Sequence, residues 1–282
     1  MAVIKMNFLS KALGFQTNIS VILPTLTMKD ISAGVKNYYQ SGMKYQVLYL
    51  LHGGSGDYED YIKFSNIVRY AEEHRLCVVM PCGCNSRYTD AGFGPRYFQY
   101  ISEELPAVCR SMFPISGARE DTFAAGLSMG AQGAMKLGAM HPEKYHTILC
   151  MSGAAFNPDK IKSIRRPIEA EKEGPDSMPV PDAEALWGDL DKFKGSIHDA
   201  WHYARVNIER QGPKPNFYFA VGDLDINKDV VDEAYEYITQ LGYSTHYEIV
   251  PGYGHEWDFW DLILRKAFEE KWFPLKKERI LQ

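Results

Sequence analysis

The chain has 282 residues, of which 45% are hydrophobic and 24% are charged, and its formal net charge is -5 at pH 7. These values are ordinary for a folded globular protein, so they exclude a disordered or fibrous chain. The negative balance argues against a nucleic-acid-binding surface, since phosphate contacts need a concentrated basic patch.

The cysteines and the apolar runs indicate the cellular setting. The 5 cysteines are an odd number at irregular spacing, unlike the framework of a disulfide-rich secreted protein. The N-terminal stretch lacks an uninterrupted apolar core followed by a small-residue cleavage site, and no other stretch approaches a membrane span. We therefore expect a cytoplasmic protein with no membrane partner and no nucleic-acid partner.

Short apolar runs and amphipathic stretches alternate along the chain. The predicted strands are residues 18–24, 45–51, 76–81, 121–127, 147–153, 216–222 and 245–251. The predicted helices are residues 59–74, 99–112, 131–140, 196–212, 229–242 and 256–272. This alternation predicts an α/β fold in one domain, residues 1–282, with a mostly parallel sheet and helices on both faces.

Residues 157–195 interrupt this alternation. The segment is rich in Pro, Lys, Glu and Asp, and no hydrophobic period is visible along it. Connections of roughly this length in compact domains are usually functional lids or disordered linkers. We expect a lid-like insert with a polar surface.

The sequence G-L-S-M-G, residues 126–130, lies where one apolar run ends and a helical pattern begins. It matches the G-x-S-x-G pattern of a nucleophile elbow, in which a sharp strand-to-helix turn exposes the serine. Such a turn leaves no room for side chains two residues before and after the serine, which accounts for both glycines. Ser128 is therefore the candidate nucleophile.

A serine hydroxyl becomes a good nucleophile when a neighbouring imidazole takes its proton. Among the 8 histidines, His255 fits this task best, because it follows a strand-like run and a glycine-containing loop and precedes a helix. Reacting groups in open α/β sheets gather beyond the carboxyl ends of the strands, where this loop and Ser128 would both lie. His255 is therefore the candidate general base.

An imidazole that acts as a base needs a carboxylate to fix its tautomer and stabilise its cation. The apolar run 216–222 is followed by two aspartates, Asp223 and Asp225, which gives the chain order Ser, Asp, His. Geometry favours Asp225, since Asp223 is close enough to the strand end to serve as a turn or cap residue.

The oxyanion of the reaction needs preorganised N–H donors, and at a nucleophile elbow the residue after the serine, here Met129, supplies one. The second donor should follow an early strand. The run 45–51 leads directly into His52-Gly53-Gly54, where glycine lets the backbone approach a substrate oxygen. The alternative for this segment is a flexible glycine turn without that role.

A rival site is suggested by H-D-A-W-H, which places His198 and His202 four residues apart on one predicted helix face, as in zinc hydrolases. The pattern departs from H-E-x-x-H at Asp199, and no third ligand stands out. Ser196 and Asp199 also match a capping box at a helix start. The cysteines within residues 82–84 are too few for a zinc site. We expect no metal and no cofactor.

These residues lie in segments that resemble a known family. The segments are "NISVILP", "LLHGGSGDYEDYIKFSN", "YTDAGFGPRYFQYISEELPAVCRSMFP", "REDTFAAGLSMGAQGAMKLG", "HPEKYHTILCMSGA", "AVGDLD" and "GHEWDFW". They resemble the esterase family that includes tributyrin esterases, S-formylglutathione hydrolases and feruloyl or acetylxylan esterases, and most closely its tributyrin esterase branch. The resemblance implies an α/β-hydrolase fold. It also implies Ser128 as nucleophile, His255 as base, Asp225 as acid in a G-x-x-D loop, and Gly54 and Met129 as oxyanion donors.

We expect a serine carboxylesterase that hydrolyses short acyl esters, acetyl to butyryl, through an acyl-enzyme. The resemblance and the polar insert motivate this size limit. The chain departs from the family at Ala131, where many members have glycine, and over residues 157–195. These departures leave the catalytic residues intact but leave the substrate open, acetylated or feruloylated sugars included. The alternatives are a thioesterase like S-formylglutathione hydrolase and a catalytically silent α/β-hydrolase that serves as a binding module.

Four aromatic residues are candidates for lining the substrate pocket, where rings could stack on a sugar or phenolic group: Tyr58, Tyr88, Trp257 and Trp260. Packing within the core or between helices explains them equally well. The partner we expect is a small-molecule ester, and the oligomeric state, a homo-oligomer included, stays open.

Overall fold

The computed structural model describes residues 1–92, 94–164, 183–276 and 280–281. Eight strands form the central sheet: β1 (Ala2–Leu9), β2 (Gln16–Leu23), β4 (Val47–Leu51), β5 (Cys77–Pro81), β6 (Thr122–Leu127), β7 (Thr147–Met151), β8 (Asn216–Gly222) and β9 (Thr245–Val250). Their spatial order is β1-β2-β5-β4-β6-β7-β8-β9. β2 pairs antiparallel with β1 and β5, and the other neighbours pair parallel, which confirms the mostly parallel sheet. β3 (Met43–Lys44) and β10 (Ile280–Leu281) form a separate antiparallel pair.

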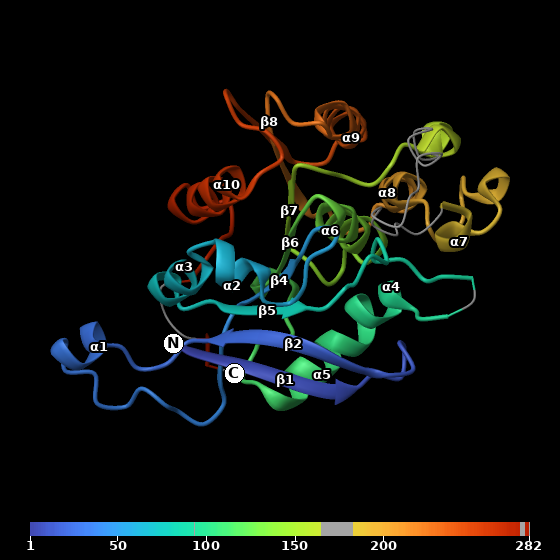
Figure 1. Cartoon of the computed structure of the whole chain (residues 1–282). Helices are drawn as coiled ribbons and strands as arrows, with labels where there is room; N and C mark the ends of the chain where they lie inside the picture. The colour runs from blue at the N-terminus through green and yellow to red at the C-terminus, as the bar shows by residue number, and fades with distance from the viewer. Residues whose placement is uncertain (93, 165–182, 277–279, 282) are drawn as a thin grey trace, which may run out of the picture.

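Helices cover both faces of this sheet, as predicted. The helices are α1 (Met28–Ser32), α2 (Asp60–Phe64), α3 (Ile67–His74), α4 (Tyr97–Gln99), α5 (Leu105–Met112), α6 (Met129–Met140), α7 (Ala183–Trp187), α8 (Ala200–Glu209), α9 (Lys228–Gln240) and α10 (Trp257–Glu269). One apolar core lies between the sheet and helices α2, α3 and α10, and a larger one lies between the sheet and α5, α6, α8 and α9. Figure 1 shows α2, α3 and α10 to the left of the sheet and α6 and α8 to its right.

The four central strands are apolar along their whole length because they are buried on both faces. Every residue of β4, β5, β6 and β7 is buried. In β1, by contrast, half-buried and exposed residues alternate, as in an edge strand with one face toward solvent. All seven predicted strands are present, and β1 is an additional strand that the apolar runs did not predict.

Two predicted helices differ from the structure in their internal geometry. The stretch 59–74 is divided into α2 and α3, because the backbone is extended at Ser65 and the N–H of Asn66 donates to Asp261 Oδ1 in α10 at 2.7 Å. The stretch 99–112 contains a π-helical segment, Tyr100–Glu104, between α4 and α5. Pro106, which has no N–H to donate, follows at the start of α5.

The predicted lid, residues 157–195, is described at both flanks, whereas residues 165–182 lie outside the described residues. The flanks contain 3-10 turns at Pro158–Ile164 and Leu190–Lys192, with α7 between them. They bury a small apolar cluster made of Ile161, Ala183, Leu190 and Phe193, with Phe156 and Trp187 packed against it. The flanks are therefore folded onto an apolar core of their own, which the polar composition of the segment did not predict.

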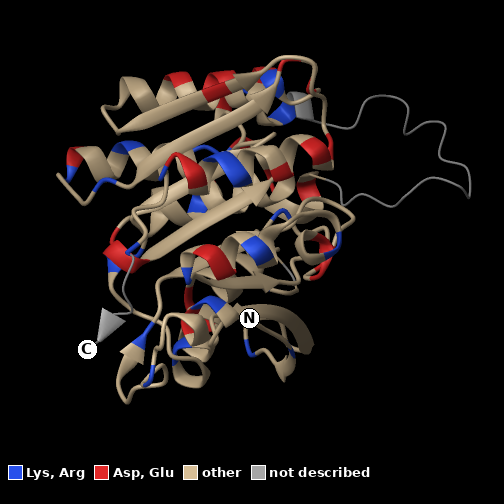
Figure 2. Cartoon of the chain, turned by 90° about the vertical axis from the view of Figure 1, so that its left-hand side faces the viewer, with Lys and Arg blue, Asp and Glu red and all other residues tan. Residues whose placement is uncertain are grey.

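Charged residues of both signs lie interspersed over helices and loops, while the strands are almost free of charge, as Figure 2 shows. None of the described helices is long and apolar enough to cross a membrane.

Candidate active site

Ser128 occupies the corner between β6 and α6 in a backbone conformation that few residues other than glycine adopt. Its φ and ψ are 51° and -115°, and it is the N-cap residue of α6. A Cβ atom at Gly126 would overlap the carbonyl of Gly130, and one at Gly130 would overlap the carbonyl of Leu51. The two glycines therefore permit the close approach of β6, α6 and β4 that holds the serine at the corner.

The structure brings together the serine, histidine and aspartate that the sequence predicted. His255 Nε2 lies 3.0 Å from Ser128 Oγ. His255 Nδ1 lies 3.1 Å from both carboxylate oxygens of Asp225. The imidazole is thus placed between a hydroxyl and a carboxylate, at distances suited to accepting a proton from one while donating to the other.

Contacts between the loops after β8 and β9 place Asp225 and His255 opposite each other. The N–H of Leu224 donates to the carbonyl of Tyr253 at 3.0 Å. Asp223, the other candidate acid, is exposed, and its Oδ1 accepts from the N–H of Gly252 at 2.7 Å. Asp223 therefore links the loop after β8 to the loop after β9, and Asp225 is the carboxylate that contacts the imidazole.

Asp225 is buried and surrounded by donors. Burial opposes its ionisation, but hydrogen bonds from His255, the Ser152 hydroxyl and the N–H of Asn227 outweigh that effect and hold the pKa of Asp225 below its ordinary value. The Asn227 bond is 2.8 Å long. Ser152 Oγ itself accepts from Trp260 Nε1 at 2.8 Å, which leaves its proton for the carboxylate. Asp225 is consequently a stable anion at neutral pH.

The loop after β4 passes directly beside the elbow. A Cβ atom at Gly53 would lie 3.5 Å from the Cβ of Ser128, so the neighbouring peptide of Gly54 is close to the serine. Within the described part of the chain, no group accepts a hydrogen bond from the N–H of Gly54 or of Met129. Both N–H groups have the surroundings expected of donors that await a substrate oxygen.

His52 orients this loop, a task that the sequence pattern did not reveal. His52 Nε2 accepts from the N–H of Gly83 at 2.8 Å, so the ring proton lies on Nδ1, which donates to the carbonyl of Gly53 at 2.7 Å. Burial lowers the pKa of His52 and keeps the ring neutral. Because N–H and C=O of a trans peptide point in opposite directions, a fixed Gly53 carbonyl also fixes the Gly54 N–H.

The aromatic candidates occupy different environments. Tyr88 does not line a pocket: its side chain is fully buried, and its hydroxyl donates to the carbonyl of His52 at 3.1 Å, so that expectation was wrong. Tyr58 is half-buried. Trp257 is also half-buried and packs edge-on against Tyr61. Trp260 is buried, with its ring edge-on to His255 at a centroid distance of 5.0 Å.

The rival histidine pair is not arranged as a helix-borne zinc site. Asp199, rather than Ser196, caps α8, and its Oδ1 accepts from the N–H of His202 at 3.0 Å. His198 therefore precedes the helix, and its Nδ1 lies 2.8 Å from Thr89 Oγ1. Among the described residues there is no group of three or more His, Cys, Asp or Glu side chains that could hold a metal ion.

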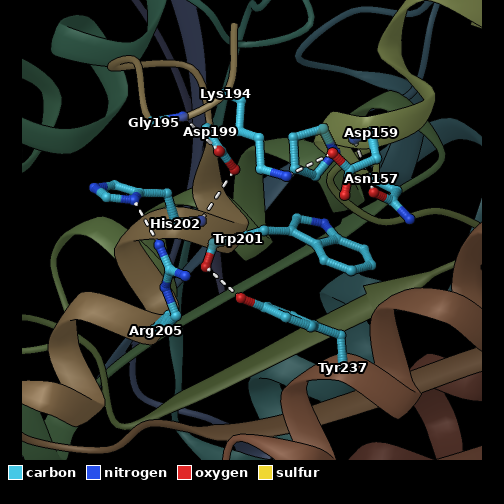
Figure 3. A pocket seen from close by; sticks show the side chains of 10 residues that line it. Asn157, Asp159, Lys194, Gly195, Asp199, Trp201, His202, Arg205 and Tyr237 are labelled. Atoms are coloured by element: carbon cyan, nitrogen blue, oxygen red, sulfur yellow. Dashed lines mark hydrogen bonds and ion pairs between the residues drawn. The ribbon is translucent and has the colours of Figure 1, made fainter.

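His202 lies instead in a cavity of about 410 Å³ between the insert flanks, α8 and α9, which Figure 3 shows. Its Nδ1 accepts from Arg205 Nη2 at 3.4 Å, so its neighbour is a cation. The rings of Trp201 and Tyr237 stack at a centroid distance of 4.3 Å on the wall of the cavity. The candidate nucleophile and base are not among its lining residues.

Comparisons with known proteins agree with this geometry. The family described as "Putative esterase" matches residues 11–269. An acetyl esterase of Caldicellulosiruptor saccharolyticus is 31% identical over 270 residues, which cover 95% of this chain and 97% of the relative. The chain belongs to this esterase family.

Solved structures place this esterase among serine hydrolases. A fluorophosphonate-binding serine hydrolase of Staphylococcus aureus is 26% identical, with a TM-score of 0.81 over 98% of this chain and 99% of that one. An S-formylglutathione hydrolase of the same organism is 27% identical, with a TM-score of 0.78 over 95% and 98% of the chains. The α/β-hydrolase fold is thereby confirmed, and the protein is a serine hydrolase that acts on carboxylic esters.

Proposed function

We propose that Ser128, His255 and Asp225 form the catalytic triad of this esterase. The observation that carries the proposal is the continuous contact from Ser128 Oγ to His255 Nε2 at 3.0 Å and from His255 Nδ1 to Asp225 at 3.1 Å. Ser128 Oγ attacks the ester carbonyl carbon while His255 Nε2 takes its proton. The buried Asp225 anion stabilises the imidazolium that results.

The negative charge of the tetrahedral intermediate falls on the former carbonyl oxygen. We propose that the N–H groups of Gly54 and Met129 donate to it, since one follows β4 and the other begins α6, on two sides of Ser128. The intermediate then collapses as His255 donates its proton to the leaving alcohol. Water activated by the same imidazole hydrolyses the acyl-enzyme and restores the serine.

We propose short acyl groups, acetyl to butyryl, as the preferred substrates, within a single catalytic domain. The relative named acetyl esterase, which matches almost the whole chain, supports a small acyl group. The described flanks of the insert also support it. Their apolar side chains pack into a cluster of their own, so these flanks present no apolar surface to a long acyl chain. Trp257 and Tyr58, both half-buried near the loops of the site, are the proposed pocket residues.

Kinetics on a series of nitrophenyl esters with two to twelve acyl carbons tests this proposal. Each methylene that reaches an apolar wall contributes about 0.8 kcal/mol, so kcat/KM should rise over the first carbons and then fall where the pocket ends. A steady rise to the longest soluble ester would contradict the short-acyl assignment. The same series with Trp257→Ala tests the proposed pocket residue. The acyl length that gives the highest kcat/KM should increase in this variant, and an unchanged optimum would show that Trp257 does not line the pocket.

A thioester substrate is the second candidate, and the similarity to an S-formylglutathione hydrolase over 95% of the chain is the observation that favours it. The same triad would serve, because a thiolate leaves more readily than an alcohol. Comparing kcat/KM for S-formylglutathione with that for a short ester decides between them. A preference for the thioester of at least about a hundredfold would replace the ester assignment.

A further inference from the structure

Two cysteines lie side by side just beyond β5, close to the loop that carries Gly54. The sulfur atoms of Cys82 and Cys84 are 3.9 Å apart. Cys84 is exposed and Cys82 is partly exposed, so small molecules in solution can reach the pair. The proposed hydrolysis uses neither thiol. The remaining cysteines of the chain are buried: Cys77, Cys109 and Cys150.

The surroundings of the pair make its two sulfurs unequal. One hydrogen bond joins the two sulfurs, and either thiol can be its donor. This contact, together with a further hydrogen bond between Cys84 and the Tyr97 hydroxyl, lowers the pKa of Cys84 even though partial burial opposes it. The same contact raises the pKa of Cys82, and burial adds to that effect. Since the thiolate is the nucleophilic form of cysteine, and Cys84 is also the more exposed of the two residues, we take Cys84 as the sulfur that attacks and Cys82 as its neighbour.

We propose that Cys84 and Cys82 form a dithiol site that reacts with small-molecule disulfides and closes to a disulfide between the two residues. The Cys84 thiolate attacks one sulfur of the reagent, forms a mixed disulfide and releases the first thiolate. Cys82 then gives its proton to solvent and attacks Cys84 Sγ, which releases the second thiolate. The cysteine pair is oxidised, and the reagent is reduced to two thiols.

The second step is enabled by the first. In the reduced protein, the hydrogen bond with Cys84, burial and the negative charge of a Cys84 thiolate all raise the pKa of Cys82 and so favour its protonated form. In the mixed disulfide Cys84 carries no charge, so Cys82 ionises more readily and can attack. Cys82 is 3.9 Å from its target before any rearrangement.

Closure of the disulfide would pull on the loop that holds Gly54. Gly83, between the two cysteines, donates its N–H to His52 Nε2 at 2.8 Å, and His52 in turn holds the Gly53 carbonyl. Asn85 Oδ1 accepts from the N–H of Ser55 at 2.6 Å on the other side of Gly54. A disulfide brings its sulfurs to about 2.05 Å and closes a small ring that contains the Gly83 peptide, so closure restrains the N–H that His52 accepts. This coupling to turnover rests on the proposed oxyanion role of Gly54.

Intact-mass spectrometry after incubation of the reduced protein with oxidised glutathione at pH 7 tests the site. The wild-type mass should fall by a pair of hydrogens, and peptide mapping should join Cys82 to Cys84. Cys82→Ser should retain one glutathione on Cys84, because no resolving thiol is present. Cys84→Ser should react at least about tenfold more slowly, and Cys109→Ala, which alters a buried cysteine, should react like the wild type.

The pH dependence of the wild-type reaction supplies a measurement that needs no variant. Its rate should reach half of its maximum below pH 8.5, roughly the midpoint for an ordinary thiol. An unchanged wild-type mass, a persistent wild-type adduct, an unmodified but folded Cys82→Ser protein, or a midpoint at or above that of free glutathione would each overturn the proposal.

Turnover of nitrophenyl acetate tests the coupling. The disulfide form should show at least about a tenfold lower kcat with little change in KM, since a displaced oxyanion donor acts on the transition state. Dithiothreitol should restore kcat, and Cys84→Ser should keep full activity before and after treatment. A disulfide that forms without changing kcat overturns the coupling. An untreated protein without turnover instead contradicts the proposed hydrolysis, and the mass measurement is independent of that result.

Discussion

Helix α6 has two buried polar groups close to it that are stabilised in opposite ways. At its N-cap, Ser128 contacts an imidazole whose other nitrogen lies 3.1 Å from the Asp225 carboxylate. Two turns further along, the ammonium group of Lys136 donates to the carbonyl of Tyr88 at 3.0 Å and to Thr89 Oγ1 at 3.2 Å. The Asp225 carboxylate and the Lys136 ammonium are both buried, but only Asp225 lies beside a partner, His255, that can take the opposite charge.

The pKa directions follow from this difference. Donors around Asp225 hold its pKa below the ordinary value despite burial. Lys136 is buried with neutral acceptors and the ring of Phe98, and no carboxylate forms an ion pair with it among the described residues. Burial lowers the pKa of Lys136 to about 7, although Asp90 attracts its charge from a distance. A buried carboxylate therefore stays ionised where its neighbours donate hydrogen bonds to it, whereas burial without a charged partner favours the neutral form of a lysine.

The largest expected effect comes from removing the hydroxyl at the paired end of the helix. Ser128→Ala should lower kcat by at least about 10⁴-fold, because it removes the hydroxyl that is proposed to form the acyl-enzyme. Thermal unfolding of the variant should match the wild type, since a serine at this corner contributes chemistry rather than packing. A variant that turns over nitrophenyl acetate at near the wild-type rate would show that Ser128 is not the nucleophile.

The second prediction removes the negative charge of Asp225 from its contact with His255. Asp225→Asn should lower kcat by roughly 10³- to 10⁴-fold, because an amide cannot hold the imidazole in the required tautomer. Asp223→Asn is the matched control, and it should change kcat by less than about tenfold, since the Asp223 carboxylate accepts from the backbone of the neighbouring loop and not from His255. The reverse ranking in steady-state kinetics would show that Asp223 is the working acid.

A smaller effect is expected from weakening the shell around Asp225. Ser152→Ala removes one donor to the carboxylate, so the pKa of Asp225 should rise and kcat should fall by about three- to tenfold. The pH profile should shift with it, with activity lost at a higher pH as the medium is acidified. Ser20→Ala is the control, because Ser20 is equally buried but its hydroxyl has no hydrogen-bond partner among the described residues. Equal kcat values for Ser152→Ala and Ser20→Ala would show that the Ser152 hydroxyl does not support the Asp225 carboxylate.

The smallest effect on turnover is expected at Lys136. Its pKa of about 7 in the folded chain lies below the unfolded value of about 10.4, so the unfolded state binds more protons between these values. The free energy of unfolding should therefore rise with pH from about 7 to 10, by up to about 1.4 kcal/mol per pH unit from this group.

Lys136→Met should remove that rise and change kcat by less than about threefold. Urea unfolding at pH 7, 8 and 9 measures the slope, and Lys11→Met, at an exposed lysine, is the control that should leave it unchanged. A slope that survives in Lys136→Met would mean that the ammonium keeps its proton in the folded state, and that burial of Lys136 costs less than its surroundings indicate.

The elbow could be predicted from sequence because the pattern that marks it, G-x-S-x-G, is contained in five consecutive residues. Gly126 and Gly130 leave room for backbone that lies next to them along the chain or across β4. The interruption of the helix at Asn66 could not be predicted, since the acceptor that captures its N–H is Asp261, 195 residues further along. Local periodicity carries no information about such a partner.

Burial explains the other differences. Tyr88 is an aromatic residue near the predicted loops, and only the packing around it shows that its ring faces the core and its hydroxyl bonds to His52. The histidine pair at 198 and 202 has the spacing of a helix face, but the cap at Asp199 starts the helix between them. A pattern predicts a shared face only where the helix includes both residues.

Ser128 and His255 are separated by 127 positions, and this spacing has a consequence for the chain as it is made. β8 and β9, whose following loops carry the proposed acid and base, come after the proposed nucleophile in translation order. At roughly 5 to 20 residues per second, the ribosome needs about 6 to 25 s to add the residues between serine and histidine. If Ser128 and His255 act as proposed, the nascent esterase carries its nucleophile for seconds without a base, and turnover begins only after β9 has joined the sheet.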